Sequence, residues 1–402
     1  MQLLSTKSLI NIAVGACLLS SVAHAASLEA VEGLNVNQPY YTPEKFVQQE
    51  HAPVVNLTGI APEEHGKAIM AIAGQEVRQF LINAKRKFEI IGLDSAELAK
   101  QLKVTYKNSK ALNPDYMVTL ESLAKELDVD AHELFALTQT DYAVVQLLNK
   151  GVKTDAKAAG CTSMAFNLSG VVGQTNDLAS LDGGTGILLK KDDTIVAMTG
   201  FGPAGQTLGK NVGVVINFLG ADTDGVDLDS GMATGMGVLV EQAAKSENVD
   251  EALELLKKHR TIVGMNFTMA DIYGGAVSVE MSKGGLLVTR GDKGVAHANH
   301  SLRENSEKDF RAKLGGTFRE QTIQSAYSFW RQDVADTFLK HTPETSVEAM
   351  QYIFSQKPIA QTAAYGSDFI TVSTVVMDTK AGCIHFAPGV SEWNSYQQVC
   401  FD

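Results

Sequence analysis

Apolar residues recur at helical spacing in the N-terminal part of the chain. The clearest case is residues 62–92, where Pro62 stands at a first-turn position, acidic residues follow it, and Gly92 ends the apolar pattern. Similar spacing predicts helices over about 114–126 and 130–150. We therefore expect the first part of the chain to be mostly helical, after an extended or surface lead-in.

From Gly160 onward the pattern changes to short apolar and β-branched runs separated by turn residues. One pair of strands is expected to turn at Ser169 and Gly170, and the next pair at Asp192 and Asp193. Runs of strands then alternate with runs of helices, which is typical of an α+β fold with stacked sheets. The later elements expected are a strand in NVGVVINFLG, helices at about 232–259, strands within 265–292, helices between about 305 and 355, and closing strands within 369–388.

Composition and charge argue against a nucleic-acid partner. The 402 residues are 45% hydrophobic and 20% charged, an ordinary balance for a soluble globular protein. Because the formal net charge is -12, a polyanion would be repelled over most of the surface.

Residues 1–25 have the parts of an export signal. A single cation, Lys7, precedes an apolar run, and the small residues of AHA at 23–25 fit a cleavage site after Ala25. A lipoprotein site at Cys17 fits less well, because the apolar run continues past that cysteine. No later stretch reaches the roughly 18 to 20 apolar residues that a membrane span requires. We therefore expect a periplasmic or secreted protein without a membrane span.

Cysteine usage then leaves one thiol unpaired. Without Cys17 the exported chain keeps an odd number of cysteines in a compartment that favours disulfides. Cys383 and Cys400 lie in two β-like pieces near the C-terminus and are the natural pair. Cys161 is then the free thiol.

Other motifs predict neither a cofactor nor a metal. The glycines of GFGPAG at 200–205 have dinucleotide-loop spacing, but Pro203 and a following strand occupy the place where a helix should begin. The acidic loop at 222–231 lacks the closing glutamate of a calcium loop. His297 and His300 have no cysteine or carboxylate nearby at zinc spacing.

The adjacent residues Gly160 and Cys161 are candidates for cleavage of the chain by its own thiol. A lone cysteine is more often a small buried hydrophobe than a nucleophile. However, a glycine before a thiol at the start of a strand suits attack of the thiol on its own preceding peptide bond. The resulting thioester would be opened by water, and the new chain would begin with Cys161. Its free α-amine, with an ordinary pKa of about 7.7 to 8.0, could then accept the thiol proton.

Six stretches together resemble one family. They are EEHGKAI at 63, PDYMVTLESLAKELDVDAHELFALTQTDYA at 114, GCTS at 160, GQTNDL at 173, GVVINFLG at 213 and HANHSL at 297. With them the chain is similar to the isopenicillin N acyltransferase family of N-terminal nucleophile (Ntn) hydrolases, which includes carcinine hydrolase-like amidases, and more distantly to choloylglycine hydrolases and penicillin V acylases. The resemblance spans nearly the whole exported chain.

This resemblance implies a four-layer αββα sandwich that cuts itself between Gly160 and Cys161. A helical α chain, residues 26–160, and a catalytic β chain, residues 161–402, would form one Ntn-hydrolase domain. The nucleophile would be Cys161, with its own amine as base. The other roles implied are orientation of the terminal cysteine by Asp177, and stabilisation of the oxyanion by Asn299 and Asn217. Hydrogen-bond donors preorganised around an oxyanion lower the barrier by several kcal/mol, which is why amide side chains suit this role.

Two positions depart from the family. Gln139 stands where an arginine is frequent, although Asp141 keeps an acid nearby. Gln361 is the residue closest to a second arginine that acyltransferase members carry before the closing strands. Both departures weaken the case for a penicillin-type or carboxylate-binding pocket.

The function expected is hydrolysis of a linear amide C–N bond in a small N-acylated substrate. Export favours water over coenzyme A chemistry, because that thioester donor is cytosolic. The alternatives are acyl transfer to an amine and an uncut, non-catalytic binding protein of the same fold.

Overall fold

The computed structural model describes residues 51–90, 92–149, 160–179, 186–200, 206–219, 225–303, 318–361, 369–389, 391 and 395–402. All of these residues belong to one compact unit, Gln48–Asp402. The expected signal segment 1–25 and most of the GFGPAG motif lie outside the described residues.

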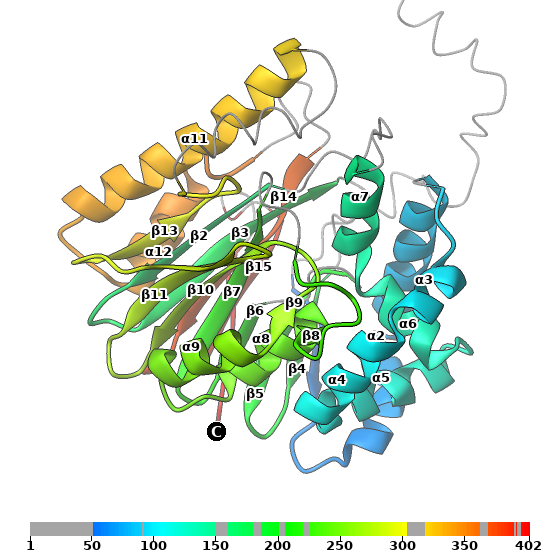
Figure 1. The fold of residues 1–402 in the computed structure, drawn as a ribbon. Coiled ribbons are helices and arrows are strands. Elements are labelled where there is room, and N and C mark those ends of the chain that lie inside the picture. Colours follow the sequence, from blue (N-terminus) through cyan, green and yellow to red (C-terminus); the bar gives the residue numbers. More distant parts are fainter. Residues whose placement is uncertain are drawn as a thin grey trace, which may run out of the picture. The chain divides into compact units, whose positions relative to one another are not determined.

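Two large sheets organise this unit (Figure 1). All their ladders are antiparallel except that between β1 and β4. The eight-stranded sheet has the order β1 (Val54–Asn56), β4 (Ile187–Lys190), β5 (Thr194–Met198), β6 (Gln206–Gly209), β7 (Val212–Phe218), β10 (Met265–Asp271), β11 (Ala276–Ser282) and β12 (Gly285–Thr289). The six-stranded sheet has the order β13 (Gly294–His297), β2 (Gly160–Phe166), β3 (Val171–Ala179), β14 (Phe369–Asp378), β15 (Cys383–Pro388) and β16 (Gln397–Cys400). Short strands β8 (Ala233–Thr234) and β9 (Arg260–Thr261) pair separately.

The two sheets pack face to face, with helices on both outer faces. Alternate residues of a strand point to opposite faces, so Val215 packs between the sheets while its neighbours Val214 and Ile216 belong to the helix-covered core. That outer core includes α8 (Met236–Ala244) and α9 (Val249–Lys258). The other sheet is covered by α11 (Phe318–His341) and α12 (Val347–Ser355). These four layers give the αββα arrangement of an α+β fold, and the predicted fold class is confirmed (Figure 1).

The expected N-terminal helices are present. α2 (Pro62–Ile90) packs against α5 (Pro114–Glu126), which begins with a proline after the capping residue Asn113. The block expected at 130–150 forms two helices, α6 (Ala131–Leu137) and α7 (Thr140–Asn149). Two further helices were not predicted, α3 (Ser95–Gln101) and α4 (Lys103–Leu112). Both segments are short, and α4 is polar on average, so few apolar residues mark them.

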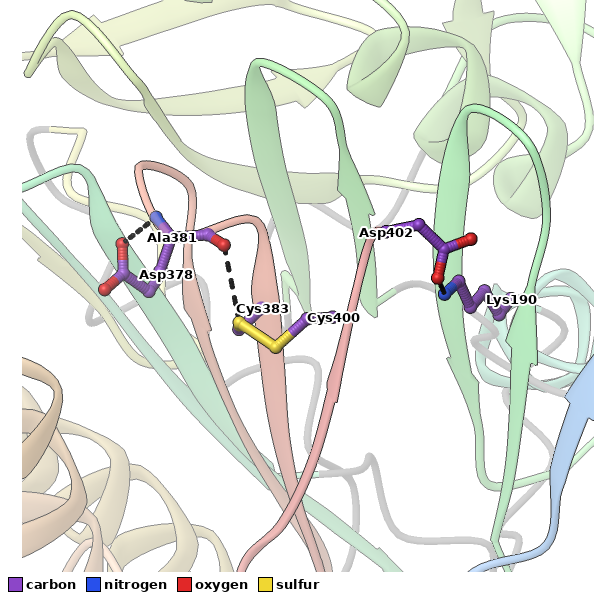
Figure 2. The surroundings of a disulfide bond; sticks show 6 residues. All are labelled: Lys190, Asp378, Ala381, Cys383, Cys400 and Asp402. Carbon is purple, nitrogen blue, oxygen red and sulfur yellow. Dashed lines mark hydrogen bonds and ion pairs between the residues drawn. A yellow bond between two sulfur atoms is a disulfide. The ribbon is translucent and has the colours of Figure 1, made fainter.

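Two links fasten the C-terminal strand near its last residue. Cys383 on β15 and Cys400 on β16 occupy paired positions and are joined by a disulfide with an S–S distance of 2.02 Å (Figure 2). Beyond the strand, the carboxylate of Asp402 lies 2.6 Å from Nζ of Lys190, on β4 of the other sheet (Figure 2). In the part of the chain that the structure describes, Cys161 is the free cysteine, and it is buried. No helix among those residues combines the length and apolar character needed to cross a bilayer.

Candidate active site

Cys161 lies where one ladder of the six-stranded sheet ends. On one side β2 pairs with β3, and Cys161 faces Asn176. On the other side β13 stops at His297, which pairs with Ser163. The backbone groups of Cys161 that point toward β13 therefore lack a strand partner and must be satisfied by other groups.

Two side chains take the place of that missing strand. The backbone N–H of Cys161 donates to Oδ1 of Asn299 at 2.7 Å, and the guanidinium of Arg331 donates to the carbonyl oxygen of Cys161. Arg331 also donates to Oγ1 of Thr162 at 2.8 Å and to Oδ1 of Asn299 at 2.7 Å. Because arginine has no acceptor, the amide oxygen of Asn299 must face it. The Nδ2 of Asn299 then donates to the carbonyl of Phe218 at 3.1 Å.

Asp177 is fully buried directly across the ladder from Gly160. Its Oδ1 accepts from the hydroxyl of Thr371 at 2.6 Å, and its Oδ2 accepts from Nε2 of Gln361 at 2.7 Å. A Cβ added at Gly160 would lie 2.9 Å from Nε2 of Gln361 and 3.5 Å from Cβ of Asp177. The space beside Gly160 is therefore too small for a larger residue unless Gln361 moves.

Burial perturbs both titratable groups at this peptide. It raises the pKa of the Cys161 thiol to about 12, and the charge of Asp177 adds to the effect. Hydrogen bonds from the backbone of Asp177 and the side chain of Gln174, with the charge of Arg331, act in the opposite direction. Burial likewise raises the pKa of Asp177 to about 7, although Arg331, Thr371 and Gln361 favour its ionised form. The thiol of the uncut chain is therefore protonated at neutral pH, and Asp177 titrates close to neutrality.

Asn217 lies in a neighbouring polar network between the sheets. Its Oδ1 accepts from the hydroxyl of Ser163 at 2.5 Å, and its Nδ2 donates to the carbonyl of His297 at 3.1 Å. The hydroxyl of Ser163 also lies 2.7 Å from that of Thr268 on β10. The structure thus brings Gly160, Cys161, Asp177 and Asn299 together, whereas the contacts of Asn217 run to the strand positions beside them.

The loop that carries Asn299 is anchored to the other sheet by Glu280 of β11. This carboxylate is buried, and it binds Nε2 of His297 at 3.0 Å, the hydroxyl of Ser301 at 2.5 Å and the backbone N–H of Leu302 at 2.6 Å. Both ring nitrogens of His297 are engaged, since Nδ1 lies 2.8 Å from the carbonyl of Ala298. Among the described residues no group of three or more His, Cys, Asp or Glu side chains is arranged to hold a metal ion.

Sequence reasoning missed Arg331. The sequence suggested that a second arginine was absent near Gln361, but an arginine reaches the site from α11 instead. The available signal was its place on the buried stripe of that helix, with Ser328, Ala335 and Leu339, where a charged residue requires a partner. Gln139, the other departure, is buried at the α6–α7 junction and accepts weakly from the N–H of Met236 at 3.5 Å.

Comparisons with known proteins point to the family that the sequence resembles. No curated protein matches the chain. Among solved structures, a mutant of the conjugated bile acid hydrolase from Clostridium perfringens is 12% identical, with a TM-score of 0.41 over 60% of this chain and 92% of that one. The penicillin V acylase from Agrobacterium tumefaciens is 11% identical, with a TM-score of 0.37 over 61% of this chain and 80% of that one.

A family model gives the assignment. Residues 240–390 match the model described as acyl-coenzyme A:6-aminopenicillanic acid acyl-transferase. This region includes Asn299, Arg331, Gln361 and Thr371, which surround the Gly160–Cys161 peptide and Asp177. Residues 240–390 are thus similar to this acyl-transferase family, in agreement with the predicted resemblance.

Proposed function

We propose that the chain is an exported, self-processing cysteine amidase of the Ntn hydrolase class, acting on linear amide bonds of small N-acylated substrates. The observation that carries the proposal is the environment of the Gly160–Cys161 peptide. Its N–H is bound by Asn299, its flanking carbonyl by Arg331, and a buried carboxylate lies opposite it. The backbone contacts would be needed beside any residue at this ladder end, but a cysteine with a purely structural role would not need the buried carboxylate.

The thiol donates to Oδ1 of Asn176 at 3.6 Å in the uncut chain, and self-cleavage would begin when its proton passes instead to Asp177, whose charge acts on this thiol. The sulfur attacks the carbonyl carbon of Gly160, the C–N bond breaks, and the nitrogen of Cys161 takes up a proton to become an amine. Water then opens the thioester, releasing the carboxylate of Gly160 and regenerating the thiol. Asn299 holds the nitrogen that leaves.

In the processed chain the α-amine of Cys161 would act as base. Its ordinary pKa of about 7.7 to 8.0 suits exchange of a proton with the thiol near neutral pH. The thiolate attacks the substrate carbonyl, the amine product leaves with the proton, and water hydrolyses the acyl thioester. Asp177 would orient the new ammonium group. Asn299, and Asn217 through the network behind it, are proposed to support the oxyanion side of the site.

Intact mass and N-terminal sequencing of the purified protein test this proposal. We expect two fragments, the second beginning at Cys161, and amidase activity in the cut material. The variant Cys161→Ala should remain uncut and inactive. A single uncut chain in the wild-type protein would instead favour the non-catalytic binding protein, and an active Cys161→Ala variant would exclude this nucleophile.

Acyl transfer is the second candidate, because the matching family model is described as an acyl-transferase. Added amine or thiol acceptors would separate the reactions, since transfer changes the product distribution and not only the rate. N-acyl amino acids, penicillins, bile-salt conjugates, acyl-homoserine lactones and β-alanyl amines form the substrate panel. Export after cleavage at Ala25 is tested by the N-terminus of the first fragment.

A further inference from the structure

The proposed function requires Asp177 to keep one orientation beside the Cys161 peptide, and β14 supplies the means. Across this ladder Thr371 pairs with Asp177 and Ser373 pairs with Asn176, so Val372 is an extra, bulged residue. Without the bulge, the register from Ser373 would put Val372 opposite Asp177. Bulges re-aim side chains near functional sites. Here the bulge places a hydroxyl, not an isopropyl group, opposite the carboxylate.

A second contact of the Thr371 hydroxyl directs its proton toward Asp177. The backbone N–H of Gln361 donates to Oγ1 of Thr371 at 2.8 Å, and the N–H of Thr371 donates to the carbonyl of Gln361 at 2.9 Å. Because the hydroxyl accepts from Gln361, its single proton is available for Oδ1 of Asp177. The side chain of Gln361 completes the arrangement by donating to Oδ2.

We infer that Thr371 and Gln361 are positioning residues for the reaction at Cys161, holding both oxygens of Asp177 as an ionised acceptor beside the scissile peptide. This inference rests on the proposed function. Two donors face the two carboxylate oxygens, an arrangement that matches an acceptor-only, ionised Asp177. The other charged or titratable groups that act on Asp177 are the Arg331 guanidinium and the Cys161 thiol.

The test removes each donor without changing side-chain size greatly. Thr371→Val and Gln361→Met each delete one hydrogen bond to the carboxylate, so the pKa of Asp177 should rise. The acid limb of the pH profile, for self-cleavage and for turnover, should move upward by about one pH unit in each variant. Thr371→Ser keeps the hydroxyl and should restore the wild-type profile. Thr374→Val makes the same chemical change on the same strand, where the hydroxyl contacts the carbonyl of Gly389 at 3.4 Å, and should leave the profile unchanged.

A second measurement, which does not depend on turnover, tests the same inference. In the Cys161→Ala background, carboxyl ¹³C NMR should show Asp177 titrating about one pH unit higher when Thr371→Val or Gln361→Met is added. If Thr371→Val fails to fold by circular dichroism, Gln361→Met decides the question. Unshifted profiles and titrations in folded variants of a protein that cuts itself at Cys161 would overturn this inference alone. A wild-type chain that is never cut there would overturn the proposed function.

Discussion

Replacing Gly160 with alanine separates self-cleavage from turnover. Gly160 lies in β2, and the added methyl group would come within 2.9 Å of Nε2 of Gln361. Real Cβ contacts are essentially never this short, so the amide of Gln361 must withdraw from Oδ2 of Asp177, to which it donates at 2.7 Å. The substitution therefore acts on the carboxylate through a neighbour.

The size of the effect follows from that lost hydrogen bond. A hydrogen bond to a charged group contributes about 1.5 to 3 kcal/mol, and each 1.36 kcal/mol changes a rate about tenfold. Below about pH 7, where a raised pKa lowers the ionised fraction of Asp177, we expect Gly160→Ala to slow self-cleavage by about tenfold. Once cut, the catalytic fragment 161–402 has the wild-type sequence, so kcat/KM per cut molecule should be unchanged.

The assay follows the appearance of the fragment beginning at Cys161 by mass spectrometry and then measures amide hydrolysis by the cut fraction. A double-mutant cycle with Gln361→Ala checks the route of the effect, because the alanine at 160 has no amide to displace in that background. The double variant should be cut no more slowly than Gln361→Ala alone. Wild-type cleavage rates in Gly160→Ala, or additive effects in the double variant, would refute the reasoning.

Three further predictions concern Arg331, pH and the disulfide. Arg331→Met removes donors to Cys161, Thr162 and Asn299 and should lower kcat/KM at least about 100-fold in folded protein; a loss below about threefold would contradict the role given to Arg331. Because burial raises the pKa of Asp177 to about 7, the rate of self-cleavage should fall as pH drops below about 7. The acid limb of turnover should lie at lower pH, because the new ammonium group of Cys161 lowers the pKa of Asp177 in the cut chain. Between pH 3.8 and about 7, Asp177 is protonated in the native uncut chain but ionised in the unfolded chain. The free energy of unfolding of Cys161→Ala should therefore fall as pH rises through that window. Adding Asp177→Asn should remove this slope. Cys383→Ser/Cys400→Ser opens a link across 17 residues and should lower the free energy of unfolding by about 3 kcal/mol in urea titrations, without a change in the pH profile.

Much of the fold could be predicted because its elements are locally encoded. The helix at Pro114–Glu126 begins at a proline and is capped by Asn113, and the β2–β3 turn falls at residues 167–170, all signals that lie within a few positions of one another. The nucleophile candidate could also be predicted, since Gly160 and Cys161 are adjacent in sequence. Short elements such as β6 and β8 were missed, because four and two residues are too few to show an alternating pattern.

The groups around the candidate nucleophile could not be predicted in the same way. Thr371 faces Asp177 only because Val372 is bulged, and Arg331 reaches Cys161 from a helix 170 positions later in the chain. The bulge has no local sequence signal, and the place of Arg331 on a buried helix stripe indicates that it needs a partner but not which one. The orientation of the Asn299 amide is similarly a consequence of Arg331, which can only donate.

The end of the β13 ladder explains why these distant groups meet at Cys161. A strand residue ordinarily satisfies its N–H and C=O through its neighbours, but β13 stops at the partner of Ser163, so the backbone of Cys161 is left open on that side. Asn299 and Arg331 close it with side chains, and such partners can release the new N-terminus once the peptide is cut, whereas a continued ladder would hold the backbone of Cys161 in place. An early ladder end beside a glycine, a thiol and a buried carboxylate thus favours cleavage of this peptide over a purely structural role for Cys161.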